Sequence, residues 1–97
     1  MKVLNKRTDP IPEGAAYVGR PSIFGNPFVI GKDGSRKEVV EKYRRRFEEM
    51  LNDPGFVLAL EGLRSATALV CWCAPLECHV SVIVEYLERT RPKGGKP

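Results

Sequence analysis

All the cysteines and the single histidine of this 97-residue chain lie within nine residues, in the segment CWCAPLECH at residues 71–79. Thiols and imidazole are the side chains best suited to nucleophilic attack, metal ligation and proton transfer near neutral pH. The remainder of the sequence holds no comparable concentration of reactive groups. We therefore expect any chemistry of this protein to involve this segment.

Two neighbouring apolar patterns predict how the segment is positioned. Residues 67–73 form a continuous apolar run, which is typical of a central strand covered on both faces. Apolar residues then recur with the helical period at Val80, Ile83, Val84 and Leu87. The pattern predicts a final helix that ends near Arg91. Cys73 would then lie at the end of a strand, and Cys78 and His79 in the first turn of a helix.

A strand end next to a helix start favours the binding of anions. In open α/β sheets, ligands collect outside the carboxyl ends of the strands. A helix N-terminus presents unpaired N–H groups and a partial positive charge, which also stabilises a thiolate. We expect a pocket here, with Cys78 or His79 as its catalytic group. Adjacent helical residues point about 100° apart, so the two are not expected to form a nucleophile–base pair.

A zinc site is the main alternative for the same residues. Three thiolates and an imidazole are a known structural zinc set, which here would be Cys71, Cys73, Cys78 and His79. The spacing argues against it, because Cys71 and Cys73 would lie about 6.5–7 Å apart on one strand face. Thiolates bound about 2.3 Å from one zinc lie closer together than that. Cys71 is interpreted instead as a core residue, and zinc stays possible but not favoured.

The clearest helix is predicted over residues 36–51. Ser35 and Glu38 have the spacing of a capping box, in which each side chain satisfies a backbone donor of the first turn. The buried stripe of this helix comprises Val39, Val40, Tyr43, Phe47 and Met50. Asp53 and Pro54 predict a second, shorter helix, with a strand at residues 56–60 as the alternative.

The N-terminal third predicts short extended segments and one shaped loop. The extended segments are expected at residues 2–7, 15–19 and 28–30. Residues 20–28 are rich in turn residues yet contain two phenylalanines, so this loop is expected to pack against the body of the protein. Together the elements predict a compact single α/β domain over residues 1–91, with a small sheet of three or four short strands and about three helices. Residues 92–97 are expected to form a flexible tail.

Composition narrows the class of protein. The chain carries a formal charge of +4, which permits phosphate-bearing partners but supports nucleic-acid binding only weakly. No run approaches the roughly 20 apolar residues of a membrane span, and no secretion signal is recognised. An odd number of cysteines rules out a complete internal disulfide framework. We therefore expect a cytoplasmic protein with reduced thiols and no membrane partner.

Two motifs resemble a known family. The sequences YVGRP at residues 17–21 and GNPF at residues 25–28, together with CWCAP at residues 71–75 followed by Cys78 and His79, are similar to small phage and bacterial proteins known as domain of unknown function 4326. The resemblance spans residues 17–87 and implies no established reaction. The family commonly has a small and then an acidic residue after the Cys-His pair, where this chain has Val80 and Ser81.

The resemblance implies that the loop and the turn act together. Arg20 would fork onto a phosphate or carboxylate, and Asn26 would supply amide hydrogen bonds. Ser22 and Cys73 complete the expected ligand-binding residues. The expected ligand is a phosphate-bearing small molecule, a nucleotide or a nucleic-acid end, and the sequence leaves open whether a reaction follows. The alternative is a non-enzymatic interaction module in which the Cys/His cluster binds zinc or is structural. Trp72 is expected in the core.

Overall fold

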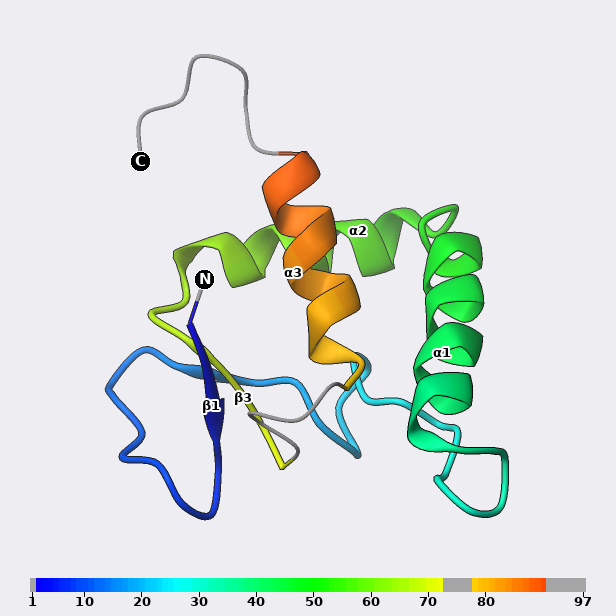
Figure 1. Cartoon of the computed structure of the whole chain (residues 1–97). Helices are drawn as coiled ribbons and strands as arrows, with labels where there is room; N and C mark the ends of the chain where they lie inside the picture. The colour runs from blue at the N-terminus through cyan, green and yellow to red at the C-terminus, as the bar shows by residue number, and fades with distance from the viewer. Residues whose placement is uncertain (1, 73–77, 91–97) are drawn as a thin grey trace.

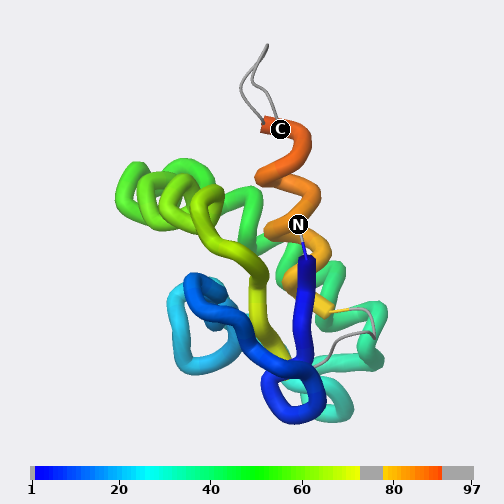
Figure 2. Tube along the Cα trace, turned by 90° about the vertical axis from the view of Figure 1, so that its left-hand side faces the viewer, coloured from blue at the N-terminus to red at the C-terminus, as the bar shows by residue number. Residues whose placement is uncertain are grey.

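Within the described residues, three short parallel strands form one small sheet, which lies to one side of the helices (Figures 1 and 2). They are β1 (Val3–Asn5), β2 (Ala16–Tyr17) and β3 (Leu69–Cys71), arranged in the order β1-β3-β2. The computed structural model describes residues 2–72 and 78–90. Because all the strands run parallel, their carboxyl ends meet at one edge of the sheet. β3 pairs on both sides and all its residues are buried, as its continuous apolar sequence predicts.

Three α-helices of the described residues lie beside this sheet. They are α1 (Arg36–Met50), α2 (Pro54–Gly62), which continues into a 3-10 turn at Leu63–Ser65, and α3 (Val80–Arg89). Both halves of the capping box at Ser35 are formed, and Asp53 caps α2 by accepting from the Gly55 N–H. The segment after β2, cyan in Figure 1, leads to the N-terminus of α1. Among the described residues, no helix is long and apolar enough to cross a membrane.

The core lies where the three helices meet. Phe47 of α1 is 1% exposed, and its ring centroid lies 5.7 Å from that of Phe56 in α2 and 5.6 Å from that of Tyr86 in α3. The largest other fully buried side chains come from β3 and the residue after β2, and from α2 and α3: Val18, Leu60, Leu69, Cys71, Val80 and Ile83. The aromatic contacts therefore hold α1, α2 and α3 around one shared cluster.

The predicted compact α/β domain with a small sheet and three helices is confirmed. The helix after Asp53 is also confirmed, and the alternative strand at residues 56–60 is wrong. The strands are shorter than predicted, because pairing is limited to the few residues that face β3. No strand forms at residues 28–30, where Val29 donates to the Asp33 carboxylate and accepts from the Asp33 N–H in a turn. The predicted tail at residues 92–97 lies outside the described part.

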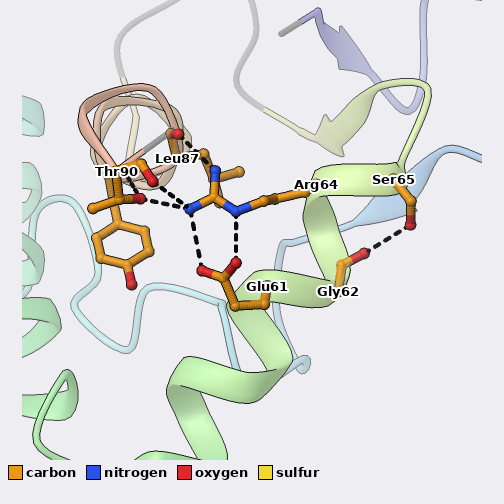
Figure 3. A network of polar contacts seen from close by, with 7 residues as sticks. Glu61, Gly62, Arg64, Ser65, Leu87 and Thr90 are labelled. Atoms are coloured by element: carbon orange, nitrogen blue, oxygen red, sulfur yellow. Dashed lines mark hydrogen bonds and ion pairs between the residues drawn. The ribbon is translucent and has the colours of Figure 1, made fainter. Parts of the chain in front are cut away.

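A polar network around Arg64 ties the 3-10 turn to the end of α3 (Figure 3). The guanidinium donates to both carboxylate oxygens of Glu61, at 2.7 and 3.1 Å. It also donates to the Leu87 carbonyl at 2.8 Å and to the Thr90 hydroxyl at 2.6 Å. The last carbonyls of a helix have no partner within that helix. Arg64 therefore caps the C-terminal end of α3 from a distant part of the chain.

Replacing Arg64 with methionine is expected to lower the free energy of unfolding by about 1–2 kcal/mol, because charge-assisted hydrogen bonds to α3 are lost. Arg64→Lys keeps the charge without the planar guanidinium group, so its free energy of unfolding should lie between those of the wild type and Arg64→Met. Urea unfolding followed by circular dichroism measures both. Arg45→Met, an exposed position on α1, is the matched control and should leave the midpoint unchanged. Equal midpoints for Arg64→Met and the wild type would contradict this role.

Candidate functional site

The loop after β2 is a tight turn that presents Arg20. The Gly19 carbonyl accepts from the N–H of Ser22 at 2.9 Å and from its hydroxyl at 2.6 Å. A Cβ atom on Gly25 would lie 2.9 Å from the backbone of Arg20, so only glycine allows this close approach. The Arg20–Pro21 peptide bond is cis. The glycines and the serine therefore shape the loop so that the Arg20 side chain is exposed at its start.

Helix α1 holds the same loop in place. The Tyr43 hydroxyl donates to the Phe24 carbonyl at 2.8 Å, and the Asn26 amide donates to the Val39 carbonyl at 3.1 Å. The Asn26 side-chain oxygen also accepts from the N–H of Phe28 at 2.9 Å. Phe24 is buried, which confirms that this loop packs against the body of the protein. The amide nitrogen and the amide oxygen of Asn26 therefore both stabilise the loop.

His79 is a buried residue that joins the turn before α3 to the end of β2. Its Nε2 lies 2.7 Å from the carbonyl oxygen of Val18, which can only accept, so Nε2 carries the proton and donates. The ring meets Tyr43 edge-on, with centroids 5.0 Å apart. The remaining nitrogen, Nδ1, keeps the lone pair that can accept a proton or a hydrogen bond.

The placement of Cys78 and His79 in the first turn of a helix is wrong. α3 begins at Val80, and His79 is its capping residue without a side-chain capping bond. The Cys78 carbonyl instead accepts from the N–H of Ser81 at 3.1 Å and from its hydroxyl at 2.9 Å. The His79 side chain instead contacts the Val18 carbonyl. Such a contact between segments far apart in sequence has no local signal.

Burial lowers the pKa of His79, and the nearby positive charge of Arg20 lowers it further, while the hydrogen bond to Val18 acts in the opposite direction. The neutral imidazole is therefore the form that predominates near neutral pH. A neutral ring with a protonated Nε2 and a lone pair on Nδ1 has the form required of a general base.

The protein is expected to lose stability as the pH falls below 6.5, the ordinary pKa of histidine. In that range the unfolded chain takes up a proton on His79 that the folded protein resists, so acid favours unfolding. Urea unfolding at about pH 7.5 and about pH 5.5 measures the effect. His79 is the single histidine of the chain, so His79→Gln should reduce this pH dependence strongly. An unchanged pH dependence in the variant would contradict the assignment.

Two thiols meet beside this histidine. The Sγ atoms of Cys71 and Cys78 lie 3.6 Å apart in a buried hydrogen bond. Cys71 is 1% exposed, which confirms the prediction that it belongs to the core, and Cys78 is 7% exposed. The end of β3 and the turn before α3 are thus in direct contact through sulfur.

A cavity of about 100 Å³, here called the Cys-His cavity, joins the loop to the turn. It lies at the carboxyl ends of β2 and β3, as the general rule for parallel sheets predicts. Arg20 reaches it from the loop and Arg36 from the first turn of α1. Its described lining contains no carboxylate and consists of Gly19, Arg20, Asn26, Phe28, Ile30, Arg36, Val39, Val40, Cys71, Trp72, Cys78 and His79. Its charged groups therefore favour an anion.

A larger cavity of about 300 Å³, here called the aromatic cavity, adjoins the other side of the loop. Its walls include Tyr43, Phe47 and Phe56, and a second cation, Arg46, lies at its edge. Arg20 lines both cavities. A ligand held by Arg20 can therefore extend into either space.

The described site residues expected from the sequence are divided between the two cavities. Arg20, Asn26, Cys78 and His79 share the Cys-His cavity. Ser22 lines the aromatic cavity, and its hydroxyl holds the loop. Cys73 lies outside the described residues, so the alternative zinc set cannot be placed as a whole. Among residues 2–72 and 78–90, no group of three or more His, Cys, Asp or Glu side chains is arranged to hold a metal.

Arg36 and Trp72 are among the residues lining the Cys-His cavity that sequence reasoning did not assign to it. Arg36 places a cation at the positive end of a helix, where acidic residues are favoured, and this local conflict was the available signal. The prediction that Trp72 lies in the core is wrong, because β3 ends at Cys71 and Trp72 is 50% exposed. Its indole Nε1 donates to the Tyr17 hydroxyl at 2.9 Å.

Fold and cavity together define a small parallel α/β domain with an arginine-lined cavity at the carboxyl ends of its strands. The family described as Domain of unknown function (DUF4326) matches residues 2–89, so the chain belongs to that family. The resemblance of the two motifs is thereby confirmed. No curated protein and no solved structure matches the sequence.

Proposed function

We propose that the Cys-His cavity binds a phosphate-bearing small molecule, with Arg20 and Arg36 on the phosphate. One observation carries the proposal: these two arginines reach the same cavity from separate segments of the chain, the loop after β2 and the first turn of α1. Guanidinium groups match phosphate oxygens in shape and charge, and they stay protonated at all relevant pH values.

A nucleotide would use more of these surroundings than free phosphate, with its phosphate in the cavity of about 100 Å³ and its base outside that cavity. Phe28 and Trp72 come from distant parts of the sequence, and both line the cavity with aromatic rings. Trp72 is half exposed. A nucleobase gains roughly 1–3 kcal/mol by stacking on such a ring. The adjoining aromatic cavity offers a second place for the base, because Arg20 borders both spaces.

His79 is the residue best suited to any proton transfer in this cavity. It is neutral, and its Nε2 proton is committed to Val18, so the Nδ1 lone pair is the basic site. The Cys78 thiol lines the same space and could act as a nucleophile. Binding comes first in the proposal, and catalysis would depend on what the ligand presents to these groups. We propose a cytoplasmic setting, because an odd number of thiols suits a reducing compartment.

The alternative function is an interaction module stabilised by zinc. One observation favours it: the Sγ atoms of Cys71 and Cys78 lie 3.6 Å apart, close to the roughly 3.8 Å expected for thiolates bound about 2.3 Å from a tetrahedral zinc. Cys73 and His79 would have to supply the remaining ligands. Metal analysis of protein purified without chelator separates the proposals, because one tightly held zinc per chain would support the module.

Fluorescence of Trp72 tests nucleotide binding directly, since it is the single tryptophan and lines the cavity. AMP, ADP and ATP are titrated against the protein at low salt, with adenosine and inorganic phosphate as controls. Saturable quenching by a nucleotide is expected, with adenosine at least tenfold weaker because it lacks the phosphate. Calorimetry gives the stoichiometry. No saturable change with any phosphate-bearing probe at millimolar concentration would overturn the proposal.

A further inference from the structure

The buried thiols of Cys71 and Cys78 have a chemistry that ligand binding does not use. We propose that these cysteines are a site of oxidative modification, at which a peroxide converts them to an intramolecular disulfide that thiols reduce again. The Sγ atoms already lie 3.6 Å apart, so they need to approach by about 1.5 Å to reach bonding distance. The proposal does not depend on whether the Cys-His cavity binds a nucleotide.

The fold brings the thiols together from both sides. Cys71 ends β3, where it pairs with Asn5 of β1, and its carbonyl accepts from the Lys6 N–H at 2.8 Å. Cys78 is fixed on the other side by the two hydrogen bonds between its carbonyl and Ser81. Neither sulfur therefore has to be recruited from a distant position. Contact that exists before the reaction removes much of the entropic cost of joining the groups.

The reaction balances with hydrogen peroxide as the oxidant. Cys78 is the more exposed thiol, at 7% against 1%, and it lines the cavity through which peroxide can enter. Its thiolate attacks one peroxide oxygen, the O–O bond breaks, and water leaves, so that Cys78 becomes a sulfenic acid. The Cys71 sulfur then attacks the Cys78 sulfur and displaces the hydroxyl as a second water. Two thiols and one peroxide thus yield one disulfide and two waters.

The surroundings favour this pairing over further oxidation. The sulfenic acid forms within contact of a second thiol, and condensation with a neighbouring thiol is the reaction that removes sulfenic acids. His79 lies in the sequence directly after Cys78 and lines the same cavity. The disulfide would therefore form in the floor of the cavity and alter the space beside His79.

Intact mass spectrometry of the full chain tests the proposal. Wild type and Cys73→Ser are treated at neutral pH with a small excess of peroxide, unfolded in urea with N-ethylmaleimide so that buried thiols react, and weighed. Cys73→Ser removes the third thiol and leaves the proposed pair. We expect it to lose two hydrogens, about 2 Da, to take up no label, and to recover both thiols with dithiothreitol. Peptide mapping of the wild type should join Cys71 to Cys78.

Other outcomes overturn the site. If Cys73→Ser remains fully labelled, or gains oxygen atoms without losing hydrogens, then Cys71 and Cys78 do not form a disulfide. A bridge through Cys73 in the wild type, or dimers linked between chains, shows that a different thiol is the partner. Cys78→Ala should prevent the 2 Da loss in the Cys73→Ser background, and circular dichroism confirms that this variant is folded.

Discussion

Replacing Arg20 with glutamine is expected to weaken nucleotide binding by roughly ten- to a hundredfold, which corresponds to about 1.5–3 kcal/mol of lost charge-assisted hydrogen bonding. Arg20 lines both cavities, so its loss affects a ligand in either of them. Its side chain is exposed at the start of the loop, so the substitution is expected to leave the fold intact. Trp72 fluorescence and calorimetry measure the change in Kd.

Arg45→Gln is the matched control, because it removes the same charge from an exposed position on α1 outside both cavities. A Kd that rises equally in both variants would show that Arg20 acts only through the net charge of the protein. A second readout needs no ligand: Arg20 lowers the pKa of His79, so Arg20→Gln should raise that pKa. The single histidine makes this measurable by NMR titration. An unchanged pKa of His79 would show that the charge of Arg20 does not act on the cavity.

Replacing Phe47 with alanine is expected to cost about 3–5 kcal/mol of unfolding free energy, a large part of the 5–15 kcal/mol that typical domains possess. Phe47 is 1% exposed, and its ring contacts those of Tyr43, Phe56 and Tyr86 at centroid distances of 5.6–6.0 Å. Removing it leaves a void between all three helices. Urea unfolding at neutral pH measures the loss.

Phe28→Ala provides the control for this core substitution, because Phe28 is only partly buried, on the loop. It should cost clearly less than Phe47→Ala. Phe47→Leu should lie between the wild type and the alanine variant, since leucine refills part of the volume. If Phe47→Ala cost no more than Phe28→Ala, the aromatic cluster would not be the centre of the core.

Sequence patterns predict the parts of this fold that local interactions decide. Ser35 and Glu38 lie within one helical turn, so their mutual capping needs no information from elsewhere in the chain. The apolar period of α1 and α3 likewise follows from 3.6 residues per turn. The continuous apolar run around β3 predicts a strand buried on both faces, and the burial of Cys71 follows from that. The family could also be recognised from two short motifs.

Contacts between distant segments decided what the patterns could not. Trp72 is apolar and directly follows the buried strand β3, yet it lies outside the strand and is half exposed. The His79–Val18 hydrogen bond joins the turn before α3 to the residue after β2, 61 positions away in the sequence. Arg36 lies on the Cys-His cavity only because the loop after β2 is bound to α1.

The sequence by itself determined that the reactive side chains follow a buried strand and precede a helix in a small α/β domain. Periodicity and capping carry that information, because they act over one or two turns of chain. Tertiary structure alone decided that Arg20 and Arg36 converge on those side chains and that Cys71 and Cys78 touch through sulfur. Side-chain direction at the end of a strand is set by packing against segments far away in sequence, and no local pattern encodes that packing.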